Sequence, residues 1–256
     1  MLDIINKKFF KGKVVLVSGG NGQLGKDISK MYKKLGCIVY SLDLKIINRT
    51  NNKGINQIKL DISQIEQCKK IIKYIYKKEK KIDILINNAG ASIFSHFRKR
   101  SVDQLDLVYN VNLKGTINMI IALDSFIKKN NKNKVDIINI GSIYGSSVPD
   151  FNMYKKGDRF NSEIYGATKA GIIQITRYFA KILSDKHIFC NCISPGGIKS
   201  NNKQSSPFQK RYIKNLIVKR MANTSDILFG IYYLSHPKNN YITGQNLIID
   251  GGLSLK

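Results

Sequence analysis

The sequence has no tryptophan, only 17 acidic residues against 43 basic ones, and no long apolar run. Its apolar stretches fall short of the roughly 18 residues that a membrane-spanning helix requires, so we expect no membrane partner. The opening residues, MLDIINKKFF, include the acid Asp3 and lack the apolar core of a secretory signal. We therefore expect a cytoplasmic protein.

The shortage of acids leaves a formal charge of +26 over 256 residues, a balance typical of nucleic-acid binding proteins. The same chain, however, has 40 Ile, 36 Lys and 25 Asn but only 7 Ala and 7 Arg, a skew expected of an AT-rich genome. The lysines are also spread along the chain rather than gathered on one element. We attribute the charge to this composition and expect no nucleic-acid partner.

Cysteine and histidine are scarce as well, with four and three residues. Cys190 and Cys192 alternate in one strand-like run, with no third thiol or histidine at a spacing that suggests zinc. The histidines form no HxH or HxxxH pair. The sequence therefore predicts reduced structural thiols and no metal site.

Short apolar runs alternate with helical patterns along the whole chain. Continuous apolar strands separated by helices indicate a parallel sheet covered on both faces. The sequence therefore predicts an α/β, doubly wound Rossmann-type sheet of about seven strands. The predicted strands are 13–18, 37–43, 57–61, 82–88, 134–142, 188–194 and 246–250. The predicted helices are 23–35, 64–78, 102–130, 163–184 and 225–235.

A glycine-rich turn, SGGNGQLG at 18–25, joins the first strand to the first helix. Glycines permit the tight turn and let a pyrophosphate lie against bare backbone at the helix N-terminus, where free N–H groups favour an anion. The turn therefore predicts a dinucleotide site. The residues assigned to it are Gly19, Asn21, Gly22, Gln23, Leu24 and Gly25.

Asp43 ends the second strand and predicts the choice of dinucleotide. A carboxylate there accepts hydrogen bonds from the adenosine ribose and repels a phosphate on it. The sequence therefore favours NAD over NADP. The alternative is that Asp43 only caps a loop.

Seven short motifs, taken in order, carry a family resemblance. They are SGGNGQLG at 18–25, LDIS at 60–63, NNAG at 87–90, NVNLKG at 110–115, IGSIYG at 140–145, YGATK at 165–169 and SPGGIKS at 194–200. With them the chain resembles the short-chain dehydrogenase/reductase family over its whole length. The resemblance implies a single NAD(P)-binding domain over residues 1–256. It also implies hydride transfer between nicotinamide and a carbonyl or secondary alcohol, and a homodimer or homotetramer.

Tyr165 and Lys169 lie four residues apart in a helical pattern, so both side chains occupy one helix face. A nearby ammonium favours the phenolate, and we expect it to lower the pKa of Tyr165 toward neutrality, where proton transfer is efficient. The resemblance makes Tyr165 the acid/base, Lys169 its modulator and Ser142 the group that polarises the carbonyl. It also implies that Asn112 holds a water in a proton relay.

The resemblance extends to further cofactor residues. Asp61 and Ile62 correspond to a pair that borders adenine, and the Ile198 backbone is expected to meet the nicotinamide carboxamide. Tyr165 and Lys169 are included among the cofactor contacts. The remaining residues assigned to the cofactor are Asn88, Ala89, Gly90, Pro195, Gly196 and Ser200.

Two departures from the family pattern bear on the substrate. Gln23 replaces the middle glycine of the turn, and Ser142 and Tyr165 are separated by an insert at about 148–163. We expect the insert and a loop region at about 199–220 to shape the substrate pocket, with Tyr154 and Arg159 as candidate contacts. The polarity of the insert favours a sugar or sugar phosphate. The chain also resembles oxidoreductases of flagellin modification and surface-polysaccharide synthesis.

Two other functions remain open at this stage. One is a 3-oxoacyl-(acyl-carrier-protein) reductase, whose acidic carrier would suit a basic surface. The other, of a different class, is a non-catalytic dinucleotide sensor or nucleic-acid binder on the same fold. Such a protein is expected to lack part of the set Asn112, Ser142, Tyr165 and Lys169, and all four are present.

Overall fold

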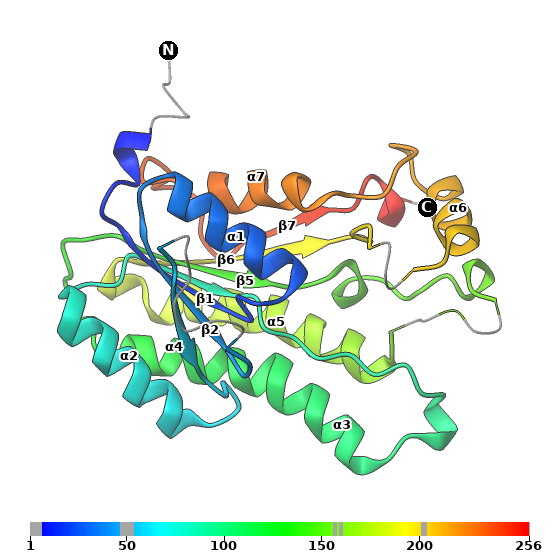
Figure 1. Cartoon of the computed structure of the whole chain (residues 1–256), viewed down its shortest axis with the longest axis horizontal. Coiled ribbons are helices and arrows are strands. Elements are labelled where there is room, and N and C mark those ends of the chain that lie inside the picture. Colours follow the sequence, from blue (N-terminus) through cyan, green and yellow to red (C-terminus); the bar gives the residue numbers. More distant parts are fainter. Residues whose placement is uncertain (1–6, 47–53, 156–157, 159–160, 201–203, 256) are drawn as a thin grey trace.

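The computed structural model describes residues 7–46, 54–155, 158, 161–200 and 204–255. Its centre is a sheet of seven parallel strands in the order β3-β2-β1-β4-β5-β6-β7 (Figure 1). The strands are β1 Val14–Ser18, β2 Ile38–Asp43, β3 Asn56–Lys59, β4 Ile84–Asn87, β5 Val135–Ile140, β6 Ile188–Pro195 and β7 Asn246–Ile249. All seven predicted strands and the predicted fold class are confirmed.

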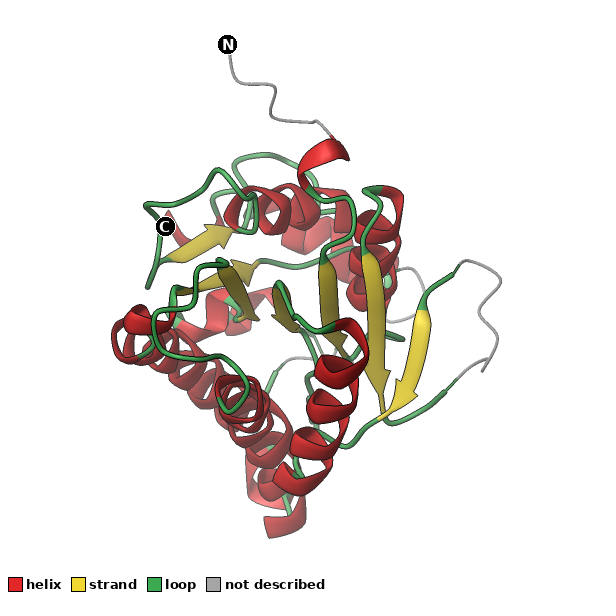
Figure 2. Ribbon diagram, turned by 90° about the vertical axis from the view of Figure 1, so that its left-hand side faces the viewer, coloured by secondary structure: helices red, strands yellow, loops and turns green. Residues whose placement is uncertain are grey.

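Helices cover both faces of the sheet (Figures 1 and 2). On one face lie α1 Gln23–Lys34 and α7 Thr224–Leu234. On the other lie α2 Ile65–Glu79, α3 Val102–Tyr109, α4 Gly115–Asp124 and α5 Glu163–Ile182. Each face has its own apolar core, as the continuous burial of β1, β4 and β5 requires.

The predicted helix at 102–130 is wrong as one continuous helix. A π-helical turn, Asn110–Lys114, separates α3 from α4, and α4 ends at Asp124. There the Ser125 N–H donates to the carbonyl of Ile121 and the Ser125 hydroxyl to that of Ala122 at 2.8 Å, which satisfies two of the helix's last acceptors. A periodic apolar pattern does not reveal one extra residue in a turn, so the interruption was missed.

The helix α6, Ser206–Lys214, was not predicted as a helix but only as part of a substrate loop. The helix begins with a common capping pattern. The Ser205 hydroxyl accepts the N–H of Phe208, and Pro207 lies in the first turn. The Ser-Pro pair could have identified it. Figure 1 shows α6 beyond the ends of β6 and β7, at the edge where the strands finish.

The chain reverses its direction across the sheet between β1 and β4. From β1 it builds outward through β2 and β3, and from β4 outward through β5, β6 and β7. Ligands of open parallel sheets bind outside the carboxyl ends of the strands at this switch point. Most of the predicted functional residues lie at or just after the carboxyl ends of the first six strands and therefore meet at one edge.

The segment after β5 packs closely on α5 at Gly145. The short 3-10 helix Ile143–Gly145 lies against α5, and a Cβ on Gly145 would be 2.7 Å from the carbonyl carbon of Lys169 and 2.9 Å from the nitrogen of Ala170. We expect Gly145→Ala to lower the free energy of unfolding by about 1–3 kcal/mol, measured by denaturant unfolding. The exposed neighbour provides the control, Ser146→Ala, and equal stability of the two variants would contradict this packing.

Candidate active site

The glycine-rich turn lies directly on the end of β4. Gly19 has a positive φ of 62°, and a Cβ on it would lie 2.7 Å from the Cα of Ala89. A Cβ on Gly25 would lie 2.2 Å from the carbonyl oxygen of Gly19. Neither position has room for a side chain, so the turn presents bare backbone at the N-terminus of α1.

Asn88 and Ser18 hold this contact together by hydrogen bonds. The Asn88 amide donates to the carbonyls of Ser18 and Gly19, both at 3.0 Å. The Ser18 hydroxyl accepts the backbone N–H groups of Asn88 and Ala89, both at 3.1 Å. The two predicted cofactor segments, after β1 and after β4, are therefore brought together.

A cavity of about 330 Å³ opens beside this contact. Because Gly22 precedes α1 without a side-chain cap, the first N–H groups of the helix are available to an anion. Eleven of the predicted cofactor residues line the cavity: Gly19, Gly22, Gln23, Leu24, Gly25, Asp43, Asp61, Ile62, Asn88, Ala89 and Gly90. The bare glycine cradle and the uncapped helix start fit a dinucleotide.

Asp43 holds the glycine-rich turn as well as facing this cavity. Its carboxylate accepts the N–H of Asn21 at 3.0 Å and that of Lys45 at 3.2 Å. The Asn21 side chain also donates to the carbonyl of Lys45. Asn21 itself does not line the cavity, and its described contacts are those of a brace between the turn and the end of β2.

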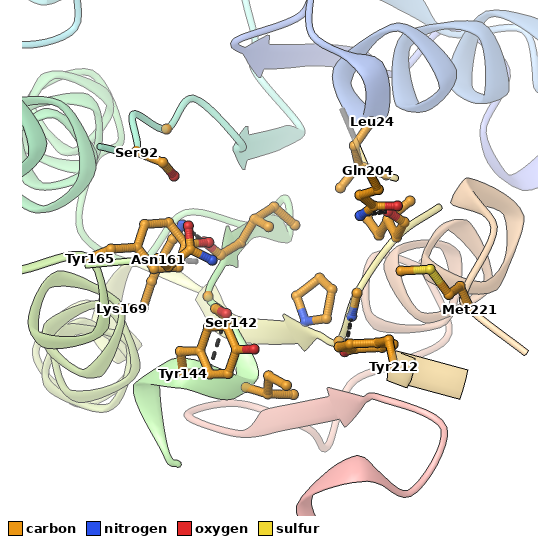
Figure 3. Close-up of a pocket in the computed structure, with 18 of the residues that line it drawn as sticks. Leu24, Ser92, Ser142, Tyr144, Asn161, Tyr165, Lys169, Gln204, Tyr212 and Met221 are labelled. Atoms are coloured by element: carbon orange, nitrogen blue, oxygen red, sulfur yellow. Dashed lines mark hydrogen bonds between the residues drawn. The ribbon is translucent and has the colours of Figure 1, made fainter. Parts of the chain in front are cut away.

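Ser142, Tyr165 and Lys169 converge on a second cavity of about 540 Å³ (Figure 3). Ser142 follows β5, whereas Tyr165 and Lys169 lie on one face of α5. The Ser142 hydroxyl is hydrogen-bonded to Tyr165, and the Lys169 nitrogen lies 5.6 Å from the centre of the Tyr165 ring. Leu24, Asn88 and Gly90 line both cavities, which are thus neighbours.

Burial dominates the ionisation of this pair. It raises the pKa of Tyr165, although the hydrogen bond to Ser142 lowers it in part. Burial also lowers the pKa of Lys169 to about 8, while its ammonium donates to the carbonyl of Ile140 at 2.7 Å. The expected shift of the Tyr165 pKa toward neutrality is therefore wrong in direction, because desolvation of the phenolate outweighs the hydrogen bond from Ser142.

Asn112 is fully buried behind Lys169 rather than exposed in either cavity. Its side chain accepts the N–H of Ala91 at 2.7 Å and donates to the Ala91 carbonyl and the Thr168 hydroxyl, both at 3.1 Å. Asn112 belongs to the π-helical turn Asn110–Lys114. Its predicted part in a proton relay stays a prediction, and the structure adds a positioning role between the loop after β4 and α5.

The loop after β6 forms the far wall of the larger cavity, which Pro195, Gly196 and Ile198 line. The Gln204 side chain donates to the carbonyl of Ile198 at 3.0 Å and accepts the N–H of Ser200 at 2.9 Å. Ser200 does not line the cavity. Gln23, the residue that departs from the family pattern, donates to the carbonyl of Lys199 at 2.8 Å and so joins this loop to the glycine-rich turn.

The described part of the insert packs on α6. Met153 is buried among Phe208, Tyr212 and neighbouring apolar residues, and Arg211 donates to the Met153 carbonyl at 2.8 Å and pairs with Asp158. Tyr154 lines the cavity as predicted, and Arg159 lies outside the described residues. The sequence missed Ser92, Tyr144, Asn161 and Tyr212 as cavity residues, and among them only Tyr144, within IGSIYG, belonged to a motif already singled out.

Comparison with known proteins now decides the family. A sequence profile described as enoyl-(acyl carrier protein) reductase matches residues 23–254. The crystal structure of a short-chain dehydrogenase from Leptospira borgpetersenii serovar Hardjo-bovis, with bound NAD⁺, matches with a TM-score of 0.90 and 37% identity, covering 99% of this chain and 97% of that one. The chain belongs to the short-chain dehydrogenase/reductase family. It is thus an NAD(P)-dependent oxidoreductase.

Two further members of the family bear on substrate and cofactor. A 3-oxoacyl-(acyl-carrier-protein) reductase from Buchnera aphidicola subsp. Schizaphis graminum is 31% identical, with 94% of this chain and 97% of that protein covered. A structure titled ElxO with NADP bound is 28% identical, with a TM-score of 0.83 and coverage of 96% and 100%. Both nicotinamide cofactors therefore occur among similar structures.

Three further properties concern membrane helices, metal ligands and thiols. No helix in the described ranges is long and apolar enough to cross a membrane. Within the same ranges, no three His, Cys, Asp or Glu side chains come together as metal ligands. The four cysteines are buried, unpaired thiols.

The contacts of Asn112 predict a structural cost when it is truncated. Asn112→Ala leaves the N–H and carbonyl of Ala91 without their partner, and we expect the free energy of unfolding to fall by about 2–3 kcal/mol. Denaturant unfolding measures this loss. Asn133→Ala, in an exposed loop, is the control, and a loss no larger than that of the control would show that Asn112 does not hold the loop.

Proposed function

We propose that this short-chain dehydrogenase/reductase uses NAD to interconvert a ketone and a secondary alcohol on a small polyhydroxylated molecule such as a sugar or sugar derivative. The observation that carries the proposal is the convergence of Ser142, Tyr165 and Lys169 on a cavity that adjoins the glycine cradle. In this proposal the glycine cradle binds the dinucleotide, and the three side chains transfer a proton to or from the substrate oxygen.

In the reducing direction, Tyr165 donates a proton to the substrate oxygen. Its raised pKa keeps the phenol protonated near neutral pH, which is the state that an acid requires. When substrate binds, the Ser142 hydroxyl turns its one proton from the Tyr165 oxygen to the substrate oxygen and stabilises the charge that develops there. The bound cofactor supplies the hydride for reduction and accepts it in oxidation.

In the oxidising direction, Tyr165 has to lose its proton first. The ammonium of Lys169, over the Tyr165 ring, stabilises the phenolate that results. Because the pKa of Lys169 is about 8, this ammonium is mostly protonated at pH 7 and loses its charge above pH 8. The part of Asn112 in a proton relay stays a prediction from the family resemblance, since its side chain is engaged by Ala91 and Thr168.

The preference for NAD rests on Asp43. Its carboxylate lies in the smaller cavity at the end of β2, where a ribose phosphate would meet a negative charge. The hydrogen bonds from Asn21 and Lys45 use only part of its acceptor capacity and leave lone pairs for ribose hydroxyls.

The preference for a polyhydroxylated substrate rests on the wall of the larger cavity. Hydroxyl, amide and carboxylate groups supplied by Ser92, Tyr144, Tyr154, Asp158 and Asn161 line it. Such a wall suits a molecule with several oxygens better than a plain acyl chain. The resemblance to flagellin-modification and surface-polysaccharide oxidoreductases that we expect from the sequence is part of the same proposal.

A second candidate substrate is a 3-oxoacyl thioester. It is favoured by the name of the Buchnera relative and by a cavity wall that also contains Phe94, Phe208 and Met221. The two candidates are separated by comparing kcat/KM for acetoacetyl-coenzyme A with kcat/KM for dihydroxyacetone and larger ketoses. A clear preference for the thioester would replace the sugar assignment without affecting the reaction class.

The central role of Tyr165 predicts a large effect of removing its hydroxyl. We expect Tyr165→Phe to lower kcat by at least about a hundredfold in both directions, because no other group takes its place as acid and base. NADH binding, followed by its fluorescence, is expected to remain. The matched control is Tyr178→Phe, on the exposed side of the same helix, and near-normal turnover by Tyr165→Phe would overturn the assignment.

The position of Asp43 predicts a change of cofactor preference. Asp43→Asn keeps an acceptor for the N–H of Asn21 but removes the charge, and we expect kcat/KM for NADP relative to NAD to rise by about tenfold. Initial rates with each cofactor measure the ratio. Asp103→Asn, on the exposed first turn of α3, should leave it unchanged, and an unchanged ratio in Asp43→Asn would contradict the role of Asp43.

A further inference from the structure

Tyr144 and Tyr154 form a pair of hydroxyls inside the larger cavity, and the proton transfer at Tyr165 and Ser142 uses neither of them. Their oxygens are 2.8 Å apart. Tyr144 belongs to the 3-10 helix that follows Ser142, whereas Tyr154 comes from the insert. Both residues line the cavity together with Ser142 and Tyr165.

The pair lies next to the reacting groups. Tyr144 is two residues after Ser142, and its N–H donates to the Ser142 hydroxyl at 3.2 Å. Figure 3 shows Ser142, Tyr144 and Tyr165 on one side of the cavity, facing Tyr212 across it. Burial, with the neighbouring Tyr154 and Tyr165, raises the pKa of Tyr144, so its phenol stays neutral. Tyr165 is among the groups that raise the Tyr144 pKa, and both phenols line the same cavity as Ser142.

Contacts with α6 hold Tyr154, which belongs to the described part of the insert, in this place. Its ring packs on that of Phe208 with centroids 5.4 Å apart, and Arg211 of α6 binds the carbonyl of Met153 and the carboxylate of Asp158. The Tyr212 hydroxyl, on the same helix, accepts the N–H of Gly197 at 2.7 Å and so joins α6 to the loop after β6. The hydroxyl pair is thus organised before substrate arrives.

A phenol has one proton to donate and two lone pairs that accept. When Tyr144 donates to Tyr154, it still accepts from a further hydroxyl, and when it accepts from Tyr154, it still donates to a further oxygen. In either arrangement Tyr144 complements one more oxygen-bearing group. A methyl or methylene group in that position would leave this capacity unused in a partly desolvated site.

From this arrangement we infer that Tyr144, positioned by Tyr154, recognises an oxygen on the carbon next to the reacting carbon. The preferred substrates are then vicinal diols in oxidation and 2-hydroxyketones in reduction. This inference rests on the proposed function, because it places the reacting oxygen at Ser142 and Tyr165. It narrows the substrate from any polyhydroxylated molecule to one with two adjacent oxygen functions at the site of reaction.

The test compares two ketones that differ only in the adjacent hydroxyl, acetoin and butanone, reduced with NADH. We expect kcat/KM for acetoin to exceed that for butanone by at least about tenfold in the native protein. Tyr144→Phe should bring the ratio close to one, and Tyr154→Phe should reduce it by a smaller factor. Tyr233→Phe, exposed on α7, should leave the ratio as it is.

Thermal unfolding of each variant separates recognition from a structural role. If Tyr144→Phe lowers stability but keeps the native ratio, the pair only ties the insert to the catalytic loop and the inference is overturned. It is also overturned if the native protein shows no preference for acetoin, or reduces acetoacetyl-coenzyme A but neither ketone. Failure to oxidise or reduce any substrate would instead count against the proposed function itself.

Discussion

The site depends on the close contact between the glycine-rich turn after β1 and the segment that follows β4. Gly19 and Gly25 have no room for a Cβ, and the Asn88 amide joins the two segments by bonds to the carbonyls of Ser18 and Gly19. Parallel pairing of β1 with β4 brings both strand ends to the same edge. A larger side chain at either glycine would separate them and close the cradle in which a pyrophosphate fits.

The groups proposed for catalysis lie at the same edge of the sheet, and burial and hydrogen bonds position them there. Burial, rather than a close ion pair, controls the ionisation of Tyr165 and Lys169, and Asn112 keeps the loop after β4 against α5. In the proposed function the insert adds substrate selection, and α6 holds the described part of the insert through Met153 and Arg211. The groups that define the reaction class thus lie at the sheet edge, and the residues proposed to select the substrate lie on segments added to it.

The sheet and the catalytic groups could be predicted because each rests on a local pattern: apolar runs, a glycine turn and the spacing of Tyr165 and Lys169. The π-helical turn at Asn110–Lys114 could not, since it shifts the apolar periodicity by a single residue. The contact between Tyr144 and Tyr154 could not be predicted from the sequence either. Tyr154 was predicted to contact substrate, but its contact with Tyr144 depends on how α6 packs against the insert. The direction of the Tyr165 pKa was wrong because burial has no simple signature in sequence.

The most direct test of this account is a crystal structure of the protein with NAD⁺. The account predicts adenosine in the smaller cavity with its ribose at Asp43, the pyrophosphate on the glycine turn and the N-terminus of α1, and the nicotinamide in the larger cavity facing Tyr165 and Ser142. Cofactor bound away from the glycine turn, or a nicotinamide out of reach of Tyr165, would contradict it.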